Sequence, residues 1–224
     1  MLPRKLEPEV MDTKDEAIDY DAMNHGDVNR SFVDDFLFAV GDRDPNVMLS
    51  VLDLGTGTAQ IPVELCRRSI DCRVTAVDLA AEMLKVAKRN VAAAELEDRI
   101  LLEQIDAKRL TYADESFDAV ISNSIVHHIP EPASVVTEML RVLRRGGLLF
   151  VRDLLRPASI DHVAELVETY ASGANTHQRQ MFHDSLCAAL TLEEIQKLLA
   201  DLGAPTDWAS QTTDRHWTIC GRKS

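Results

Sequence analysis

The chain has 224 residues, of which 46% are hydrophobic, and a formal net charge of −13. This length suits one large α/β domain with a well-buried core. The acidic balance argues against nucleic acid or an anionic membrane as the main partner, because binding to either needs a basic face.

The termini and cysteines favour an intracellular protein. The N-terminal sequence MLPRKLEPEV has no apolar core, and no later run approaches the roughly 20 apolar residues of a membrane span, so we expect neither a signal peptide nor a membrane anchor. The cysteines form no CxxC pair and no zinc-like group, which predicts reduced thiols, a cytoplasmic location and no metal. A homodimer is left open.

The first 40 residues are predicted to be an N-terminal arm and lid helices, ahead of a main domain over residues 41–224. Residues 1–14 are rich in charge and proline, so we expect order to begin near Lys14. Residues 15–40 hold two helical patterns. The second places Phe32, Val33 and Phe36 on one face, which predicts packing onto the domain.

A strand and a glycine turn follow. Residues 47–54 form an apolar, β-branched run typical of a strand that is buried on both faces. Gly55 and Gly57 then predict a sharp turn, where backbone N–H groups can approach a nucleotide-like ligand because neither glycine has a Cβ.

Strands and helices alternate through the rest of the main domain. We expect further strands at 73–77, 99–105, 117–122 and 148–152, with helices at 61–68, 80–94 and up to residue 142. Gly146 and Gly147 are predicted to cap that last helix. The alternation predicts a parallel sheet with helices on both faces.

The last third of the chain differs from this pattern. Helices are expected at 160–171 and 192–202, the second with a capping box from Thr191 to Glu194, and a strand pair at 208–212 and 216–221. The polar segment between the two helices, SGANTHQRQMFHDSL, reads as either a helix or a loop.

Asp53, two residues before the first glycine, narrows the choice of ligand. A carboxylate about 4 Å from a pyrophosphate charge would cost roughly 4 kcal/mol at an effective dielectric of 20. The same carboxylate would favour a cationic ligand. Because a dehydrogenase would also place a G-x-G turn here, the turn alone does not decide between cofactors.

From Val47 to Asp153 the sequence resembles the class I S-adenosylmethionine-dependent methyltransferases. VLDLGTGTAQ resembles the first motif of that family, VTAVDLAAEML the second and QIDA the third, while FDAVISNSIVHHI followed by VLRRGGLLFV is similar to the fourth and its sequel in the small-molecule branch. The resemblance implies a Rossmann-like seven-stranded, mostly parallel sheet with an antiparallel last strand. It also implies S-adenosylmethionine as cofactor and S-adenosylhomocysteine as product. The implied cofactor-binding residues are Asp53, Gly55, Gly57, Asp78, Leu79, Asp106, Ala107 and Asn123.

The acceptor side is less specific. The ends of parallel strands and the start of an antiparallel last strand share one rim of the sheet, which predicts substrate contacts there. The predicted substrate residues are His128, Asp153, Arg156 and Arg215. YDAMN, which contains Tyr20, resembles a stretch of the quinone-biosynthesis C-methyltransferases, and implies a lid. The candidate catalytic residues are His25, Tyr20 and His216.

The sequence therefore predicts methyl transfer to a small-molecule acceptor by in-line displacement. The Asn/Asp-Pro-Pro-aromatic tetrapeptide of amino-directed DNA methylases is absent after the fourth predicted strand, which argues against base methylation. Two alternatives remain open: a non-catalytic module that binds S-adenosylmethionine, and an NAD-dependent dehydrogenase.

Overall fold

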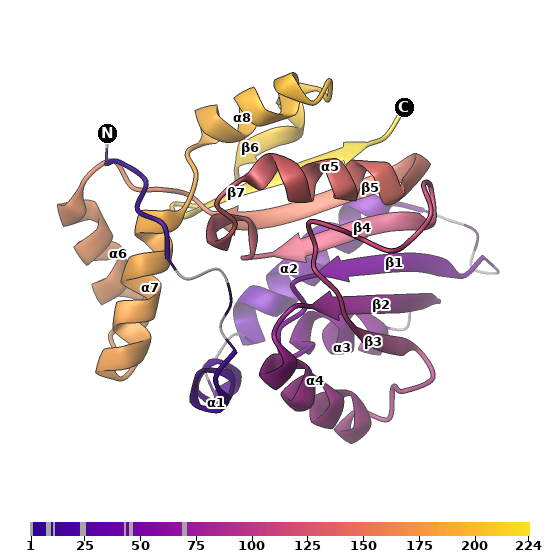
Figure 1. The fold of residues 1–224 in the computed structure, drawn as a ribbon, viewed down its shortest axis with the longest axis horizontal. Helices are drawn as coiled ribbons and strands as arrows, with labels where there is room; N and C mark the ends of the chain where they lie inside the picture. The colour runs from indigo at the N-terminus through magenta and orange to yellow at the C-terminus, as the bar shows by residue number, and fades with distance from the viewer. Residues whose placement is uncertain are drawn as a thin grey trace. The chain divides into compact units, whose positions relative to one another are not determined.

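The computed structural model describes residues 2–7, 10, 12–22, 26–42, 44, 47–68 and 71–224. Within them, seven strands form one sheet in the order β3-β2-β1-β4-β5-β7-β6 (Figure 1). β1 (Leu49–Leu54) pairs in parallel with β2 (Cys72–Asp78) and β4 (Phe117–Asn123), and β2 pairs in parallel with β3 (Ile100–Gln104). β6 (Ala209–Gln211) and β7 (His216–Arg222) pair antiparallel. The predicted fold class is confirmed.

Helices connect the strands as the sequence alternation predicts. The remaining elements are α1 (Lys14–Ala22), α2 (Gly26–Val40), α3 (Gln60–Arg67), α4 (Ala81–Ala93), η1 (Val126–His128), α5 (Pro132–Val142), β5 (Leu143–Leu154), α6 (Ile160–Ala171), α7 (Thr176–Ala188), α8 (Leu192–Asp201) and η2 (Thr206–Trp208). The segment that the sequence left open is therefore a helix, α7. It begins with a capping box in which the side chains of Asn175 and Gln178 each accept from the other residue's backbone N–H.

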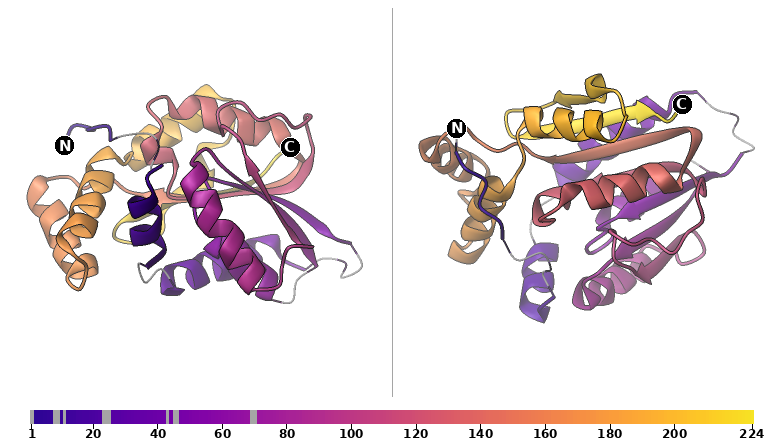
Figure 2. Two further views of the ribbon diagram at one scale, coloured as in Figure 1. Left: turned by 60° about the horizontal axis from the view of Figure 1, so that its bottom comes forward. Right: turned by 45° about the horizontal axis from the view of Figure 1, so that its top comes forward.

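The chain divides into two compact units. The first unit holds Met1–Glu9, Ser124–Ala133 and Arg152–Ile219; the second holds Val10–Asn123, Ser134–Val151 and Cys220–Ser224. In the first unit α6 and α7 lie side by side (Figure 2). Their buried faces share one apolar cluster that includes Leu166 and Leu186, and Arg179 of α7 pairs with Glu168 of α6 at 2.7 Å. Removal of this apolar surface from water is what holds the two helices together.

The second unit contains the larger apolar core. Phe32 and Phe36 of α2 are fully buried and pack edge-on against Phe150 of β5, with ring centroids 5.1 and 5.8 Å apart. Such edge-on aromatic pairs add about 0.5–1.5 kcal/mol to the burial of their area. The predicted packing of this helical face onto the domain is confirmed.

The N-terminal segment docks onto the first unit, so the prediction that order begins near Lys14 is wrong for residues 2–7. The Arg4 guanidinium donates to the carbonyl oxygens of Ala188 (2.7 Å), His127 (3.0 Å) and Ile129 (3.0 Å). The backbone N–H of Leu2 donates to Ala158 O at 3.1 Å. The planar guanidinium carries five donors and can satisfy several carbonyls at once, which fixes the segment without an apolar core of its own.

Gly146 and Gly147 do not cap a helix, because α5 ends at Val142 and both glycines lie within β5. Gly146 has φ +75° and its N–H donates to Lys223 O at 2.7 Å. A Cβ on Gly147 would lie 2.8 Å from Arg144 O and 2.9 Å from Asp118 O. The pair is glycine because two backbones approach here too closely for a side chain, and not because a helix ends.

Candidate functional site

The glycine turn that joins β1 to α3 has the geometry predicted for close approach of a ligand. Gly55 (φ 69°), Gly57 (φ 54°) and Ala59 (φ 60°) all adopt left-handed backbone conformations. The N–H of Gly55 donates to Val77 O at 2.9 Å, and the N–H of Gly57 donates to Asp78 Oδ2 at 2.8 Å. The turn is therefore held against the end of β2, with its glycines free of side chains on the ligand side.

Asp53 of β1 is a buried carboxylate with an unmet charge. Its side chain is 2% exposed, and no described residue gives its Oδ2 atom a hydrogen bond. Burial, reinforced by the negative charge of Asp78, raises the pKa of Asp53 to about 7. Such a group is costly to leave alone, and a cation placed beside it would lower its pKa and recover the cost.

Asp53 opens onto a small pocket at the turn. The pocket is lined by Tyr20, Asn29, Asp53, Gly55, Thr56, Thr58, Gln60, Ile61 and Asn123. Three further buried oxygen atoms in its wall, Thr56 Oγ1, Thr58 Oγ1 and Asn123 Oδ1, have no hydrogen-bond partner in the part of the chain that the structure describes. Four unpaired polar atoms around one pocket indicate a site for a polar ligand, because buried polar groups are otherwise almost always paired.

Tyr20 of α1 lies beside the turn, and its role as a lid stays a prediction. A Cβ on Gly57 would lie 3.6 Å from the Tyr20 ring, and the tyrosine lines the same pocket as Asp53. Burial, with a contribution from the negative charges of Asp78 and Asp53, raises the pKa of Tyr20 to about 12. The phenol is therefore protonated at neutral pH. His25, the other predicted lid residue, lies outside the described residues.

Gln60 and Asn29 complete the pocket wall, and sequence reasoning did not single them out as ligands. The amide of Gln60 donates to Asp21 Oδ1 at 2.9 Å and accepts from Asn29 Nδ2 at 3.1 Å. This chain of hydrogen bonds ties α1, α2 and α3 together. In the sequence, Gln60 stands where a dinucleotide fingerprint has its third small residue.

The strand-end acids that follow are placed near the turn. Asp78 accepts from the backbone N–H groups of Gly57 and Ala80, each at 2.8 Å, and burial raises its pKa. The N–H of Ile105, just after β3, donates to Asp78 O, which brings the next predicted acid, Asp106, to the neighbouring strand end. Asp106 Oδ1 accepts from the N–H of Lys108 at 2.9 Å. Burial opposes the ionisation of Asp106, but Lys108 outweighs it and holds the pKa of Asp106 below its usual range.

Two predicted cofactor residues flank these acids. Leu79 is 38% exposed and its carbonyl accepts from Gln104 Nε2 at 3.0 Å. Ala107 is half-buried in the turn after β3. Contacts of these residues with an adenine ring stay predictions.

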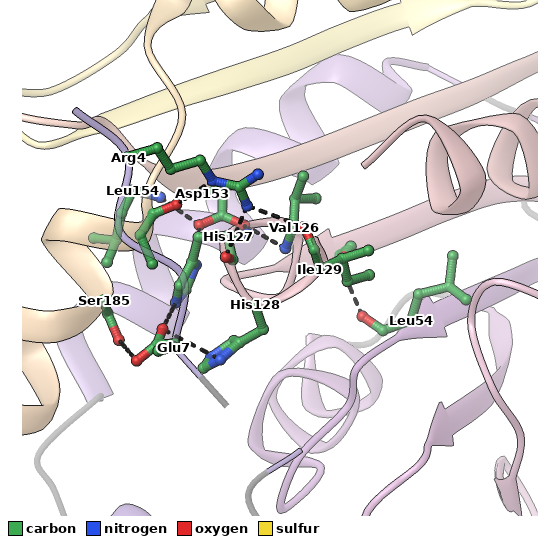
Figure 3. A network of polar contacts seen from close by, with 12 residues as sticks. Arg4, Glu7, Leu54, Val126, His127, His128, Ile129, Asp153, Leu154 and Ser185 are labelled. Carbon is green, nitrogen blue, oxygen red and sulfur yellow. Dashed lines mark hydrogen bonds and ion pairs between the residues drawn. The ribbon is translucent and has the colours of Figure 1, made fainter. Parts of the chain in front are cut away.

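In the first unit, Asp153 organises the turn that carries His127 and His128. Its carboxylate accepts from the N–H groups of Val126 (2.6 Å), His127 (3.2 Å) and Leu154 (2.6 Å), and it pairs with His127 Nδ1 at 2.5 Å (Figure 3). Burial opposes ionisation, yet His127 and the backbone donors hold the pKa of Asp153 below its ordinary value. The acid thus fixes the turn; direct contact with a substrate stays a prediction.

The other predicted substrate residues of this unit also form ordered polar contacts. Arg156 donates to Ala189 O at 2.9 Å and pairs with Glu194 at 2.6 Å. Arg215 stacks on Tyr170, with the guanidinium carbon 3.4 Å from the ring centroid, and pairs with Asp214 at 3.1 Å. Arg156 is buried and paired inside the unit, and contact of either arginine with a substrate stays a prediction.

His216 is a weaker base than the sequence-based hypothesis required. Burial, together with Arg215 and Arg152, lowers the pKa of His216 to about 4, and its Nδ1 lies 2.8 Å from Thr213 Oγ1. The imidazole is therefore neutral at pH 7 but has little driving force to take a proton.

The fold is that of an α/β protein. Its site places a buried acid beside a glycine turn, which suits a cationic, nucleoside-like ligand. Residues 52–151 match the family model described as a methyltransferase domain. The chain is 31% identical to a demethylmenaquinone methyltransferase of Porphyromonas gingivalis, over 69% of this chain and 67% of the relative. It is 30% identical to a 27-O-demethylrifamycin SV methyltransferase of Amycolatopsis mediterranei, over 75% and 59%. The chain thus spans about three-fifths to two-thirds of these two relatives.

A solved structure supports the same fold. A putative S-adenosylmethionine-dependent methyltransferase of Methanococcus maripaludis superimposes with a TM-score of 0.71 at 19% identity, over 98% of this chain and 97% of the other. The chain belongs to the S-adenosylmethionine-dependent methyltransferase family. The predicted family and its cofactor, S-adenosylmethionine, are confirmed.

Proposed function

We propose that this chain transfers a methyl group from S-adenosylmethionine to a small-molecule acceptor. The observation that carries the proposal is the buried Asp53 carboxylate beside the glycine turn, whose Oδ2 atom has no hydrogen-bond partner among the described residues. A pocket for a dinucleotide would have to place a pyrophosphate beside this acid. The methionine part of S-adenosylmethionine instead brings an ammonium group, and at about 4 Å and an effective dielectric of 20 its attraction to a carboxylate is roughly 4 kcal/mol.

The remaining residues fit the rest of that ligand. The unpaired Asn123 and Thr58 oxygens can accept hydrogen bonds from the ammonium or from hydroxyl groups. The Asp78 carboxylate, already oriented by two backbone N–H groups, retains lone pairs for the ribose hydroxyls. Asp106 and Ala107, at the end of β3, are proposed to meet the adenine.

A small-molecule acceptor is supported by the relatives and by charge. The two relatives above are named for a rifamycin and for a quinone, and a third, a phosphatidylethanolamine N-methyltransferase of Cereibacter sphaeroides, is 41% identical over 43% of this chain and 46% of that protein. The net charge of −13 is unfavourable for a nucleic acid acceptor. His128, Asp153, Arg156 and Arg215 remain the proposed acceptor contacts.

The proposed reaction needs alignment more than acid–base chemistry. S-Adenosylmethionine supplies an electrophilic methyl group on a sulfonium, which leaves as a neutral thioether. The contribution of the chain is to hold the donor by Asp53 and Asn123, and to exclude water with the Tyr20 ring. Tyr20, His25 and His216 are the proposed catalytic residues, and the low pKa of His216 favours a positioning role for it over proton removal.

The location and assembly of the protein stay predictions. Among the described residues, no helix has the length and apolarity that crossing a bilayer requires. We propose a cytoplasmic enzyme that acts on a diffusible acceptor. A homodimer is left open.

The test combines donor binding with turnover. S-Adenosylhomocysteine and NADH are titrated calorimetrically into the wild type, into Asp53→Asn, and into Asp98→Asn, an exposed acid of the same unit that serves as a matched control. We expect S-adenosylhomocysteine to bind the wild type and Asp98→Asn equally, and Asp53→Asn far more weakly. Release of S-adenosylhomocysteine from S-adenosylmethionine is then measured with phenolic, quinol and amine acceptors.

Each outcome decides between the candidate functions. Donor binding with turnover supports the methyltransferase. Donor binding without turnover on any acceptor class supports a binding module, and NADH binding that Asp53→Asn strengthens would support the dehydrogenase.

A further inference from the structure

Three side chains of the first unit converge at η1, and one of them, His128, is also a proposed acceptor contact. Glu7 comes from the docked N-terminal segment, and His127 and His128 come from η1. Figure 3 shows both imidazole rings directed at the Glu7 carboxylate. Glu7 Oε1 lies 3.4 Å from His127 Nε2 and 3.2 Å from His128 Nδ1, and all three atoms lie within 4.8 Å of one another. These are three groups that bind metal ions, gathered from two distant parts of the sequence.

The separations of Glu7 Oε1 from the two imidazole nitrogens are those of neighbouring zinc ligands. Zinc binds imidazole nitrogen and carboxylate oxygen at about 2.0–2.1 Å, and tetrahedral angles then separate neighbouring ligand atoms by about 3.3 Å. The two measured separations of 3.4 and 3.2 Å match this value. Both are too long, or too poorly directed, to be good hydrogen bonds: Glu7 Oε1 and His127 Nε2 are buried without a hydrogen-bond partner among the described residues.

The surroundings orient the ligand atoms as a metal site requires. His127 is 2% exposed, and its Nδ1 lies 2.5 Å from Asp153 Oδ1. That carboxylate also accepts from three backbone N–H groups, so it holds the Nδ1 side of the ring and leaves Nε2 as the ring atom that faces Glu7. A carboxylate behind a ligating histidine is the usual support of such a ligand.

The second oxygen of Glu7 has a weak contact of its own. Ser185 Oγ of α7 lies 3.4 Å from Glu7 Oε2, at the long end of hydrogen-bond distances, while Oε1 is the atom nearest the two histidines. In an exposed acidic cluster, by contrast, no neighbouring groups would fix the positions of the ligand atoms.

We propose that Glu7, His127 and His128 form a binding site for a divalent transition-metal ion, with zinc the best fit. The ion would tie residues 2–7 to η1 and β5 within the first unit. Three protein ligands leave one tetrahedral position for water or an added ligand.

The test uses the full chain, stripped of metal with a chelator. Zn²⁺ is titrated calorimetrically, and Co²⁺ is added separately to give the visible absorption of a tetrahedral site. We expect one equivalent of metal to bind, and the cobalt spectrum to show no thiolate-to-cobalt absorption. Zinc at a hundred times its Kd should raise the free energy of unfolding by about 2.7 kcal/mol. Glu7→Gln and His128→Ala should each weaken zinc binding at least tenfold. His177→Ala, an exposed histidine of the same unit, is the matched control and should bind zinc as the wild type does.

Two results would overturn the site. The wild type could take up neither Zn²⁺ nor Co²⁺ in a saturable way, in which case His127 is simply an imidazolium between two buried carboxylates. Alternatively, Glu7→Gln and His128→Ala could bind zinc as tightly as His177→Ala does, which would place the ion elsewhere. Glu7 lies near the end of the chain and outside the sheet, so Glu7→Gln is expected to fold; the far-UV circular dichroism of each variant checks this.

Discussion

Replacement of Asp53 by asparagine is expected to weaken donor binding and, at the same time, to stabilise the free protein. Asparagine keeps the shape of the side chain and removes its charge. The pKa of Asp53 is raised from 3.8 to about 7, mainly by burial. A shift of this size corresponds to about 4 kcal/mol of unfavourable interaction in the ionised form, at 1.36 kcal/mol for each pKa unit.

The sign of the stability effect follows from that shift. The folded-state pKa lies above the unfolded value, so the folded protein binds the Asp53 proton more tightly than the unfolded chain does. The resulting stabilisation is complete below pH 3.8 and is lost as pH rises through about 7. At pH 8 the wild type therefore carries a penalty of up to about 4 kcal/mol, which Asp53→Asn lacks. In urea unfolding, the variant should be more stable at pH 8, and the advantage should shrink toward pH 4.

Ligand affinity should change in the opposite direction. At pH 8 the variant loses the attraction between carboxylate and ammonium, up to about 4 kcal/mol, which is roughly a thousandfold in Kd. Below pH 7 the wild type must first lose the Asp53 proton, so its Kd for S-adenosylhomocysteine should rise about tenfold for each pH unit, and Asp53→Asn should show no such slope. The compound 5′-methylthioadenosine has no ammonium group and serves as the control ligand. Its affinity should be flat with pH in both proteins.

The reasoning fails if Asp53→Asn is less stable than the wild type at pH 8 with folded spectra at both pH values. It also fails if both proteins bind S-adenosylhomocysteine with the same pH dependence. Either result would mean that Asp53 is not the isolated buried charge on which the choice of ligand rests.

Three further predictions concern single residues. Gly147→Ala should lower the free energy of unfolding in urea by about 1–3 kcal/mol, because the new Cβ meets two backbone oxygens within 3 Å. Gly173 has open space around it, so Gly173→Ala should stay within about 0.5 kcal/mol of the wild type. Equal effects of the two substitutions would contradict the crowding at Gly147. Tyr20→Ala should raise the Kd of S-adenosylhomocysteine about tenfold through lost aromatic contact, and Tyr20→Phe should change it little; equal losses would assign the effect to the hydroxyl. Because the pKa of His216 is about 4, His216→Ala should leave any inflection of kcat/KM near pH 7 in place, and an inflection that disappears in this variant would make His216 the titrating base.

Much of the fold could be predicted because its determinants are local. The β-branched run before Gly55 and the amphipathic pattern of α2 reflect burial of nearby residues, and both elements form as expected. The docking of residues 2–7 could not be predicted, since it depends on Arg4 meeting carbonyl groups that lie far along the chain. The Gly146–Gly147 pair was wrongly predicted to cap a helix. Two glycines after a helical pattern can end the helix or can make room for a neighbouring backbone, and the sequence is the same in both cases.

The candidate site shows the same division. Asp53 was identifiable because its distance from the first glycine is fixed by the turn. The unpaired side-chain oxygens of Thr58 and Asn123 could not be predicted, since they depend on the absence of donors from other described elements. Likewise Glu7 and His127 have no characteristic ligand spacing in the sequence, and only the docked N-terminal segment brings them to 3.4 Å.

Asp53 and Asp153 show how structure separates two acids that the sequence treats alike. Both lie on apolar strands, both are buried, and both were predicted to face a ligand. Asp153 receives four donors and its pKa is lowered, so its charge is already compensated by the protein and it can serve as scaffold. Asp53 keeps an unpaired oxygen and its pKa is raised, so its charge is compensated only when a cation arrives. A buried carboxylate therefore indicates a ligand by its unmet hydrogen bonds, and burial alone does not distinguish the two roles.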